Sequence, residues 1–442
     1  MPEQSDIKSD NTSSAEDKVS ASAIVPAVTE PRLDSDPLPP HPETSPGARR
    51  WAMGILMLCI ICLGLGQTIL FAILPPIARS IGLADIQVGI IFTVSAFMWV
   101  FFSPYWGRRS DVLGRKPVIL LSVGMFAVSI GALAVVLELG LNSVISVMAV
   151  FVLLVLSRSL HGIFVSAGPA AAQAYVADRT APEERTASLA GLTAAFGLGA
   201  SIGPGIGSAT VQFGPVVPLY IVTIISVLSF IAIFIWLPER SKPVVRKDRR
   251  KLQLNDKRLW PVFIYGAGGG LLMVIPIQLI GFYLIDVLQL DELTASQYLG
   301  VALMVSSMAS LFSQLVIVQR LKLSPWLLLQ IAPAMVLVGH AIIALGRDFG
   351  TIVFGLMLAG LGTGIIMPAY NAAVSLSVKA DEQGAAAGLA NSFFAVGFII
   401  APIIAFSLYD SSPQTPFICS AMIAFAMIVY AWRLLGQARH QD

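Results

Sequence analysis

Residues 107–117 read GRRSDVLGRKP, and they separate two long stretches that carry no charged side chain, 86–106 and 117–137. The segment itself contains four cations, one carboxylate and two glycines. A bilayer core of about 30 Å is crossed by roughly 20 apolar residues in an α-helix. The flanking stretches therefore fit membrane-spanning helices, and the charged segment fits a short connection between them.

The composition of the whole chain agrees with this interpretation. Of its 442 residues, 56% are hydrophobic and 12% are charged, and the mean hydropathy of +0.79 lies outside the usual range of soluble domains. The apolar runs are continuous instead of alternating, which favours helices over transmembrane strands. We predict an all-α integral membrane protein with twelve transmembrane helices, at 51–75, 86–106, 117–137, 143–173, 186–212, 216–237, 260–285, 296–318, 325–346, 350–374, 384–407 and 414–435.

The N-terminal segment 1–48 has a different character. Its first 46 residues contain nine Asp or Glu and many Ser and Pro, with no apolar run that could offset the chain entropy lost on folding. It lacks the basic start and apolar core of a cleaved signal peptide. We expect a disordered cytoplasmic tail at 1–48, and a second, short cytoplasmic tail at 437–442.

Lys and Arg residues are distributed unequally between the two sides that twelve spans would create. Twenty-two lie on one side and two, Arg79 and Arg347, on the other. The larger group has nine members in the linker 238–259, and the others are Arg49, Arg50, Arg108, Arg109, Arg115, Lys116, Arg179, Arg185, Arg320, Lys322, Lys379, Arg433 and Arg439. Because cytoplasmic loops are enriched in Lys and Arg, we predict that both termini, the linker and 107–117 are cytoplasmic, in a bacterial inner membrane.

An internal repeat divides the chain into two similar halves. Residues 168–207 and 367–405 both read as a span, a polar acidic loop and a span of small residues. Offsets of 197 to 199 align Pro169 with Pro368, Gly191 with Gly388 and Pro204 with Pro402. Six spans return the chain to its starting side, so two copies share one orientation and are related by a pseudo-two-fold axis along the membrane normal. We predict six-helix bundles at 49–237 and 260–436, joined by the basic linker 238–259.

With these spans and this repeat, the region from about 50 to 435 resembles the major facilitator superfamily, specifically its twelve-helix drug:proton antiporter branch. The segment between the second and third spans matches the superfamily signature at Gly107, Asp111, Gly114, Arg115 and Lys116. The fourth span carries RSLHG, which is similar to the family's Arg followed four residues later by Gly. The resemblance implies a carrier whose two bundles open a central cavity to one side at a time.

The fifth span resembles the antiporter signature in the stretch GLGASIGPGIGS, at Gly199, Gly203, Pro204 and Gly207, with Ser208 where the branch usually has another glycine. Glycines four residues apart share one helix face and let a neighbouring backbone approach closely. Pro204 bends or loosens the same helix. This glycine face is either a contact along which helices move during transport, here called a mobile seam, or ordinary close packing. We favour the mobile seam because Pro402 repeats the proline in the second half.

The charged segment 107–117 has a gating role by resemblance. Asp111 and Arg115 are four residues apart and share a face on any helical turn, while Gly107 would let helices touch and Gly114 would permit a positive φ. The resemblance places Asp111 and Arg115 in a charge relay at the cytoplasmic gate, with Asp178 as the partner of Arg115. The alternative is that the cations only enforce topology, as we expect for Arg108 and Arg109.

Arg158 is the one Lys or Arg in the middle of a predicted span. A charged side chain at that depth is costly, so we expect it to face a water-filled centre. His161 follows on the same face and suits proton exchange, although a buried neutral imidazole is the alternative. Because no Asp or Glu lies deep in any span, a cavity with this cation would favour anionic or polar neutral substrates.

Uncharged polar side chains could line the same path or simply make hydrogen bonds between helices. The candidates are Gln67, Gln278, Tyr370, Asn371 and Asn391.

We predict a monomeric secondary active transporter that exports a small organic acid or siderophore-like molecule in exchange for protons. The alternatives are multidrug efflux of lipophilic drugs and proton-coupled import of a small metabolite. An enzyme is disfavoured because the chain has no metal cluster, no nucleophile elbow and no phosphate-binding glycine loop. We expect the lipid bilayer, protons and a small-molecule substrate as partners, and no cofactor, metal or nucleic acid.

Overall fold

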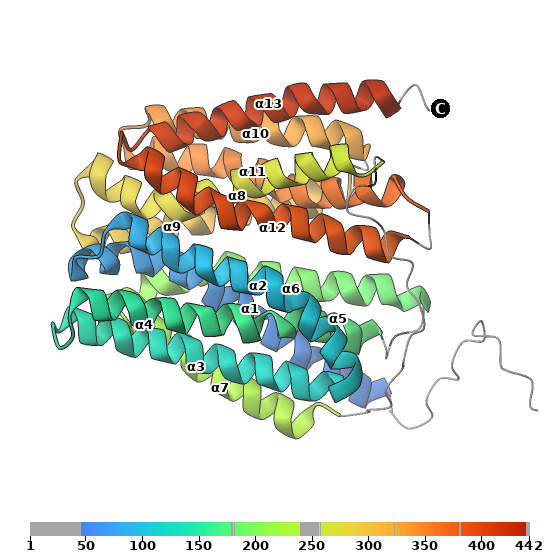
Figure 1. Ribbon diagram of the computed structural model, residues 1–442, viewed down its shortest axis with the longest axis horizontal. Coiled ribbons are helices and arrows are strands. Elements are labelled where there is room, and N and C mark those ends of the chain that lie inside the picture. The colour runs from blue at the N-terminus through green and yellow to red at the C-terminus, as the bar shows by residue number, and fades with distance from the viewer. Residues whose placement is uncertain are drawn as a thin grey trace, which may run out of the picture. The chain divides into compact units, whose positions relative to one another are not determined.

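The computed structural model describes residues 46–177, 180, 182–238, 256, 258–321, 323–379 and 382–438. Most of these residues are helical, and none of them lies in a strand (Figure 1). Of the predicted tails 1–48 and 437–442, residues 1–45 and 439–442 lie outside the described residues, as does most of the linker 238–259. Residues 46–48 and 437–438 are helical, so both tails were predicted a few residues too long.

Helices α1 to α7 form the first half. They are α1 (Pro46–Ile81), α2 (Asp85–Leu113), α3 (Arg115–Leu141), α4 (Val147–Leu160), α5 (Ala167–Ala177), α6 (Pro182–Thr210) and α7 (Val217–Trp236). A π-helical turn, η1 (His161–Val165), joins α4 to α5, so the two helices make one span. A short 3-10 turn, η2 (Val211–Phe213), follows α6.

Helices α8 to α13 form the second half. They are α8 (Trp260–Leu288), α9 (Glu292–Phe312), which continues as the π-helical turn η3 (Ser313–Val318), α10 (Pro325–Leu345), α11 (Phe349–Leu376), α12 (Gln383–Tyr409) and α13 (Thr415–Ala438). In Figure 1 these helices occupy the upper part of the drawing and α1 to α7 the lower part.

The predicted spans agree with the helices to within a few residues at most ends. Eleven helical segments of the described chain are long and apolar enough to cross a membrane. The twelfth span is α6, whose many Gly, Ala, Ser and Thr residues lower its hydropathy. Because α6 packs along α1, it belongs to the same bundle of helices, and the prediction of twelve spans is confirmed.

The two halves repeat the same helix packing. In the first half α1 packs on α6 and α3 on α7, and in the second half α8 packs on α12 and α10 on α13. This correspondence is the one expected of two like-oriented six-helix bundles, and it confirms the predicted fold class. The residue limits of the bundles, at 237 and 260, remain predictions.

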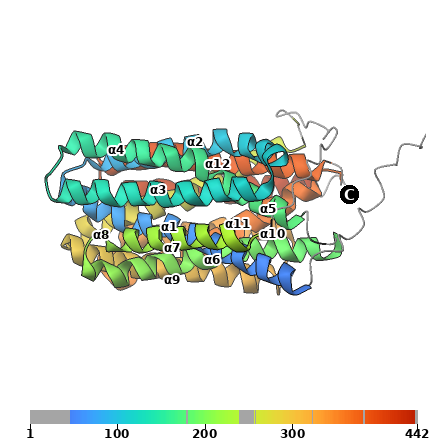
Figure 2. The same ribbon diagram turned by 90° about the horizontal axis from the view of Figure 1, so that it is seen from below.

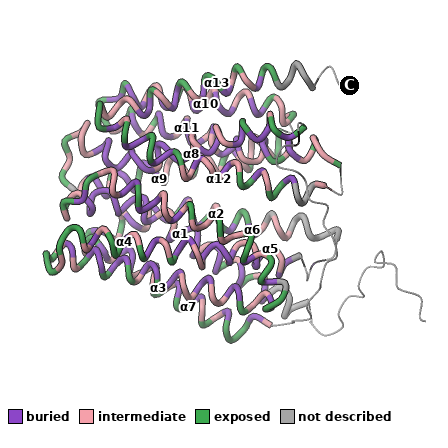
Figure 3. The backbone as a smooth tube through the Cα atoms, in the orientation of Figure 1, coloured by how far each residue is buried: buried purple, intermediate pink, exposed green. Residues whose placement is uncertain are grey.

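Most helices bury one face and expose the other (Figure 3). Large apolar side chains cover the exposed faces, for example Phe101, Leu156, Ile231, Phe354 and Phe425. Since water would not favour so many exposed apolar side chains, these faces fit contact with lipid. Hydrophobic contacts alone therefore do not hold the helices together, and small residues and polar contacts between helices matter more.

The long axes of the helices are roughly parallel to one another, as the second view shows (Figure 2), and successive spans run in opposite directions. We call the end at which α1 begins the proximal end, and the end at which α1 stops the distal end. The connections 82–84, 142–146, 289–291, 346–348 and 410–414 lie at the distal end. From the distribution of Lys and Arg, the proximal end is the one that we predict to be cytoplasmic.

Candidate functional site

The segment 107–117 is a sharp joint between two helices. Helix α2 continues to Leu113, α3 begins at Arg115, and Gly114 between them has a φ of +94°. A side chain would be strained in that conformation, so the expectation of a positive φ at Gly114 is confirmed. The expectation that Gly107 lets helices touch is wrong in this conformation, because a Cβ atom added there would have no atom of the described chain within 4 Å.

The cations beside Gly114 hold this joint in place. Arg115 donates from Nη1 to Ser110 Oγ at 2.6 Å. Lys116 donates from Nζ to the backbone carbonyl oxygen of Phe234 at 2.8 Å. The same Nζ atom lies 5.8 Å from the centre of the aromatic ring of Phe234. Lys116 therefore ties the start of α3 to the end of α7. The side chain of Asp111 and all of Asp178 lie outside the described residues, so the charge relay remains a prediction.

The glycine face of α6 packs against α1. A Cβ atom added at Gly199 would overlap the carbonyl oxygen of Ile61, and one at Gly203 would overlap the hydroxyl of Thr68. At Gly207 an added Cβ would lie 3.6 Å from Ile69, an ordinary contact. The expected close approach of two backbones is therefore confirmed at Gly199 and Gly203. Both helices belong to the first half, so the contact is compatible with ordinary close packing as well as with a seam.

Arg158 lies near the end of α4 and is 2% exposed. Its guanidinium carbon lies 6.0 Å from the ring centre of Phe92 on α2. Its Nε and Nη1 atoms are buried and have no hydrogen-bond partner among the described residues. The expectation that Arg158 faces water is wrong for this conformation, because the packing of α4 against α2 covers it. The side chain is nevertheless a buried cation with two unused donors.

His161 begins the π-helical turn η1 and is 2% exposed. Its imidazole lies between two rings, 6.1 Å from Trp99 and 5.6 Å from Phe126 between ring centres. Its Nδ1 atom has no hydrogen-bond partner in the described chain. Sequence analysis did not predict the π-helical turn, which is a feature often found at functional sites. A Cβ atom added at Gly162 would overlap the backbone of Ser95 on α2, so this turn packs tightly against α2.

The remaining polar candidates differ in their burial and in their hydrogen bonds. Gln278 is 3% exposed and its Oε1 finds no partner in the part of the chain that the structure describes, so it resembles Arg158 in having unused hydrogen-bonding capacity. Gln67 is partly buried, whereas Asn371 and Asn391 are exposed. Tyr370 is fully buried and donates to the carbonyl oxygen of Ala390 at 3.1 Å. Of the two roles left open for Tyr370, the structure shows a hydrogen bond between helices, from α11 to α12, and a place on a polar path stays a prediction.

A cluster of charges at the distal end was not predicted. Arg79, near the end of α1, contacts Asp85 at 2.6 Å and Asp286, near the end of α8, also at 2.6 Å. Tyr409, at the end of α12, donates to Asp286 Oδ2 at 2.6 Å. The guanidinium of Arg79 also lies 4.9 Å from the ring centre of Phe282. These residues join the first half to the second. The sequence did contain one indication of this cluster: Arg79 is one of only two Lys or Arg residues on the side of the membrane predicted to be outside.

Small residues bring the halves together near the same end. A Cβ atom added at Gly300 on α9 would overlap Ser208 on α6, and one at Gly89 on α2 would lie 2.5 Å from the ring of Phe406 on α12. An added Cβ at Gly281 on α8 would lie 3.0 Å from Pro75 on α1. The halves are therefore in close contact toward their distal ends. Ser208, which replaces a glycine of the resembling motif, is itself part of this contact.

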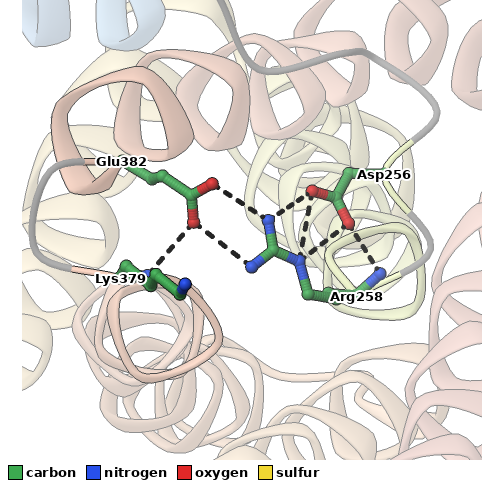
Figure 4. A network of polar contacts seen from close by, with 4 residues as sticks. All are labelled: Asp256, Arg258, Lys379 and Glu382. Carbon is green, nitrogen blue, oxygen red and sulfur yellow. Dashed lines mark hydrogen bonds and ion pairs between the residues drawn. The ribbon is translucent and has the colours of Figure 1, made fainter. Parts of the chain in front are cut away.

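A second charged cluster lies at the proximal end and belongs to the second half alone (Figure 4). Arg258, before α8, contacts Asp256 at 2.7 Å and Glu382, before α12, at 3.2 Å. The backbone N–H of Lys379 also donates to Glu382 at 3.2 Å. Hydrogen bonds from Arg258 hold the pKa of Asp256 and of Glu382 below their ordinary values. Because Arg258 is exposed, solvent screens these ion pairs.

A small pocket of about 30 Å³ lies between α8, α9 and α11 in the second half. Its walls are mostly apolar, with the hydroxyl groups of Ser306 and Thr363, and the lining residues are Met273, Pro276, Ile277, Leu303, Ser306, Leu356, Ala359, Gly360 and Thr363. A space of this size holds about one water molecule, so the pocket in this conformation is not a complete substrate site.

Two like halves of six spans, with close contacts near their distal ends, have the architecture of a membrane transporter. Residues 56–348 and 328–442 match the Major Facilitator Superfamily. The chain belongs to this superfamily.

Several bacterial relatives are similar along most of the chain. The class B tetracycline resistance protein of Escherichia coli is 26% identical over 371 residues, covering 82% of this chain and 88% of the relative. The quinolone resistance protein NorA of Staphylococcus aureus (strain COL) is 24% identical over 380 residues, covering 84% and 92%. A further relative matches less than half of the chain: the class D tetracycline resistance protein of Salmonella ordonez is 35% identical over 189 residues, covering 42% of this chain and 44% of the relative.

Solved transporters share the fold. The nucleoside transporter NupG superposes with a TM-score of 0.71 at 14% identity, covering 88% of this chain and 99% of its own. The human organic anion transporter MFSD10 (TETRAN) superposes with a TM-score of 0.62 at 20% identity, covering 88% and 100%. At these identities the likeness concerns the fold.

Proposed function

We propose that the protein is a secondary active transporter of the drug:proton antiporter branch, which exports a small anionic or polar organic molecule in exchange for protons. It acts as a monomer by alternating access, with its proximal end in the cytoplasm of a bacterium. The single observation that carries the substrate class is the buried Arg158, whose Nε and Nη1 have no partner among the described residues.

A buried guanidinium with unused donors is an unfavourable arrangement unless another group completes it. A carboxylate on a substrate supplies the charge and the hydrogen-bond acceptors that Arg158 lacks, whereas a cationic drug would add a second positive charge. Since α2 covers Arg158 here, the proposal requires a conformation in which α4 and α2 separate enough to admit the substrate. The anion would then be bound most tightly in that conformation.

His161 is the residue that we assign to proton exchange. It stands one turn from Arg158, is enclosed by Trp99 and Phe126, and has an unused Nδ1. An anion bound at Arg158 would favour the protonated imidazole, so substrate and proton binding would influence each other. His161→Gln should abolish proton movement driven by substrate while leaving downhill substrate exchange measurable.

The efflux of lipophilic drugs is the second candidate function. It is favoured by the apolar walls of the pocket between α8, α9 and α11, and by relatives that are named for resistance to tetracycline and to quinolones. Under this alternative the apolar pocket enlarges during transport to hold the drug, and Arg158 has a role in packing only. The two candidates differ in the charge of the molecule that leaves the cell.

The test compares metabolites in the growth media of a deletion strain and an overexpressing strain. We expect an organic anion to accumulate outside the overexpressing cells, and the purified anion to move protons in reconstituted vesicles. Overexpression of Arg158→Gln should remove the difference, and overexpression of Arg320→Gln, an exposed proximal cation, should keep it. Accumulation of the anion inside the cells would show import, and export of neutral or cationic compounds alone would overturn the anionic assignment.

A further inference from the structure

The distal charged cluster of Arg79, Asp85, Asp286 and Tyr409 has an unusual division between the two halves. Arg79 and Asp85 belong to α1 and α2 of the first half, while Asp286 and Tyr409 belong to α8 and α12 of the second. Arg79 contacts one carboxylate in each half, through two hydrogen bonds to Asp85 and two to Asp286. One cation is thus shared by two carboxylates, and only one of the pairs crosses between halves.

Each charge that faces the other half has a second partner in its own half. If the distal ends separate, Arg79 keeps Asp85, at 2.6 Å. Asp286 in turn keeps the hydroxyl group of Tyr409, at 2.6 Å. A partly buried charge that loses all its partners is strongly unfavourable, and these local contacts prevent that outcome. The cluster can therefore open without leaving Arg79 or Asp286 without a hydrogen-bonding partner.

We propose that these four residues form a reversible latch at the distal mouth, in which Asp85 and Tyr409 hold the separated charges while the mouth is open. The proposal rests on the proposed alternating access. Arg79 and Asp286 close the latch, together with the contact of Arg79 with Phe282. Asp85 and Tyr409 do not hold the mouth closed, but lower the free energy of the open state relative to the closed one.

This division of roles predicts effects of opposite sign from two substitutions of the same kind. Asp286→Asn removes the charge that crosses between halves and should favour the open mouth. Asp85→Asn leaves the pair of Arg79 and Asp286 intact, with Asp286 as the one charged partner of Arg79 in the cluster. It also removes the carboxylate that would pair with Arg79 after the mouth opens. It should favour the closed mouth. Tyr409→Phe should act in the same direction as Asp85→Asn, with a smaller effect, because a neutral donor is lost instead of a charge.

The measurement is the distribution of distances between spin labels on the distal ends of the two halves. Labels at Val144 and Ser411, both exposed, report the separation in full-length protein whose three cysteines, Cys59, Cys62 and Cys419, are replaced by alanine. We expect Asp286→Asn to raise the ratio of open to closed molecules about fivefold or more, and Asp85→Asn to lower it by a similar factor. Asp291→Asn is the matched control, because Asp291 is an exposed distal carboxylate that caps its own helix.

Equal effects from Asp85→Asn and Asp286→Asn, or no change from either, would overturn the latch. Should Asp85→Asn fail to accumulate in the membrane, Tyr409→Phe tests the same step from the other half, and a rise in its open population would be the contrary result. The measurement needs no substrate. A transporter that proves to export cations would therefore refute the proposed function and leave the latch standing.

Discussion

Arg79 and Arg158 are two cations within the helices of the first half, and their surroundings differ sharply. Arg79, at the distal end, has a carboxylate from each half within 2.6 Å. Arg158, in the middle of its span, lies against the ring of Phe92 and leaves Nε and Nη1 unused. A cation whose partners are all in the protein can connect its parts, whereas a cation without them is available to a ligand. By this difference we assign Arg79 to the positioning of the two halves and Arg158 to the binding of the substrate.

The largest effect that separates the two arginines is expected from Arg158→Gln. Loss of a charged hydrogen-bonding partner for the anion should reduce its transport roughly 10- to 100-fold. The distal distance distribution should stay as in the unaltered protein, because Arg158 lies against Phe92 of its own half. Uptake into vesicles and spin-label distances, measured on one preparation, check both parts. A large change in the distances would show that Arg158 also positions the halves.

The next effect is expected from Arg79→Gln, which should reverse that pattern. Removal of the ion pair to Asp286 should raise the ratio of open to closed distal mouths about fivefold or more, and reduce transport only severalfold. The affinity for the anion in the permissive conformation should be unchanged. Equilibrium binding of the exported anion measures the affinity, and the spin-label distances measure the opening of the distal mouth, so together they separate the two effects. Weaker binding with unchanged distances would place Arg79 in the substrate site instead.

The distal junction itself can be changed without touching a charge. In Gly300→Ala, the added methyl group would overlap Ser208, so the halves must move apart or the helices must shift, at a cost of about 1–3 kcal/mol. We expect a lower melting temperature and a larger open population. Gly388→Ala is the control, because an added Cβ there meets nothing within 4 Å. Equal melting temperatures for the two variants would argue against close contact at Gly300.

The smallest effect is expected from Glu382→Gln at the proximal cluster, which lies within one half. Arg258 lowers the pKa of Glu382 from its ordinary value of 4.5. The ion pair therefore adds a little stability above that pH, and the contribution is lost as the pH falls through the lower folded value. Melting temperatures of the variant and the unaltered protein should differ slightly at neutral pH and converge below pH 4.5. The distal distances should not change, whereas a shift in them would mean that this pair also connects the halves.

Most of the fold could be predicted from sequence, because a bilayer imposes a simple rule on span length and charge. The weak point was α6, whose glycines and serines lower its hydropathy although its length and neighbours are those of a span. Its glycine spacing supplied the missing signal, since Gly199 and Gly203 do face α1 closely. The repeat near an offset of 198 predicted the matching helix pairs in the two halves.

The site was harder to predict, because partners depend on contacts between distant segments. The predicted positive φ at Gly114 was correct, because backbone conformation in a turn is a local property. The predicted helix contact at Gly107 was wrong, because close approach depends on where a neighbouring helix lies. The pairing of Arg79 with Asp286 joins residues 207 positions apart, and no local pattern indicates it. Arg158 was singled out correctly as unusual, but its burial against α2 could not be read from one helix.

The most direct test of the account is the charge selectivity of transport in vesicles with an imposed proton gradient. Initial rates are compared for the exported anion and for a lipophilic cation of similar size, with the unaltered protein and with Arg158→Gln. The account predicts a strong preference for the anion that depends on the proton gradient and is lost in Arg158→Gln. Equal preference for the anion in both proteins, or faster transport of the cation by the unaltered protein, would contradict it.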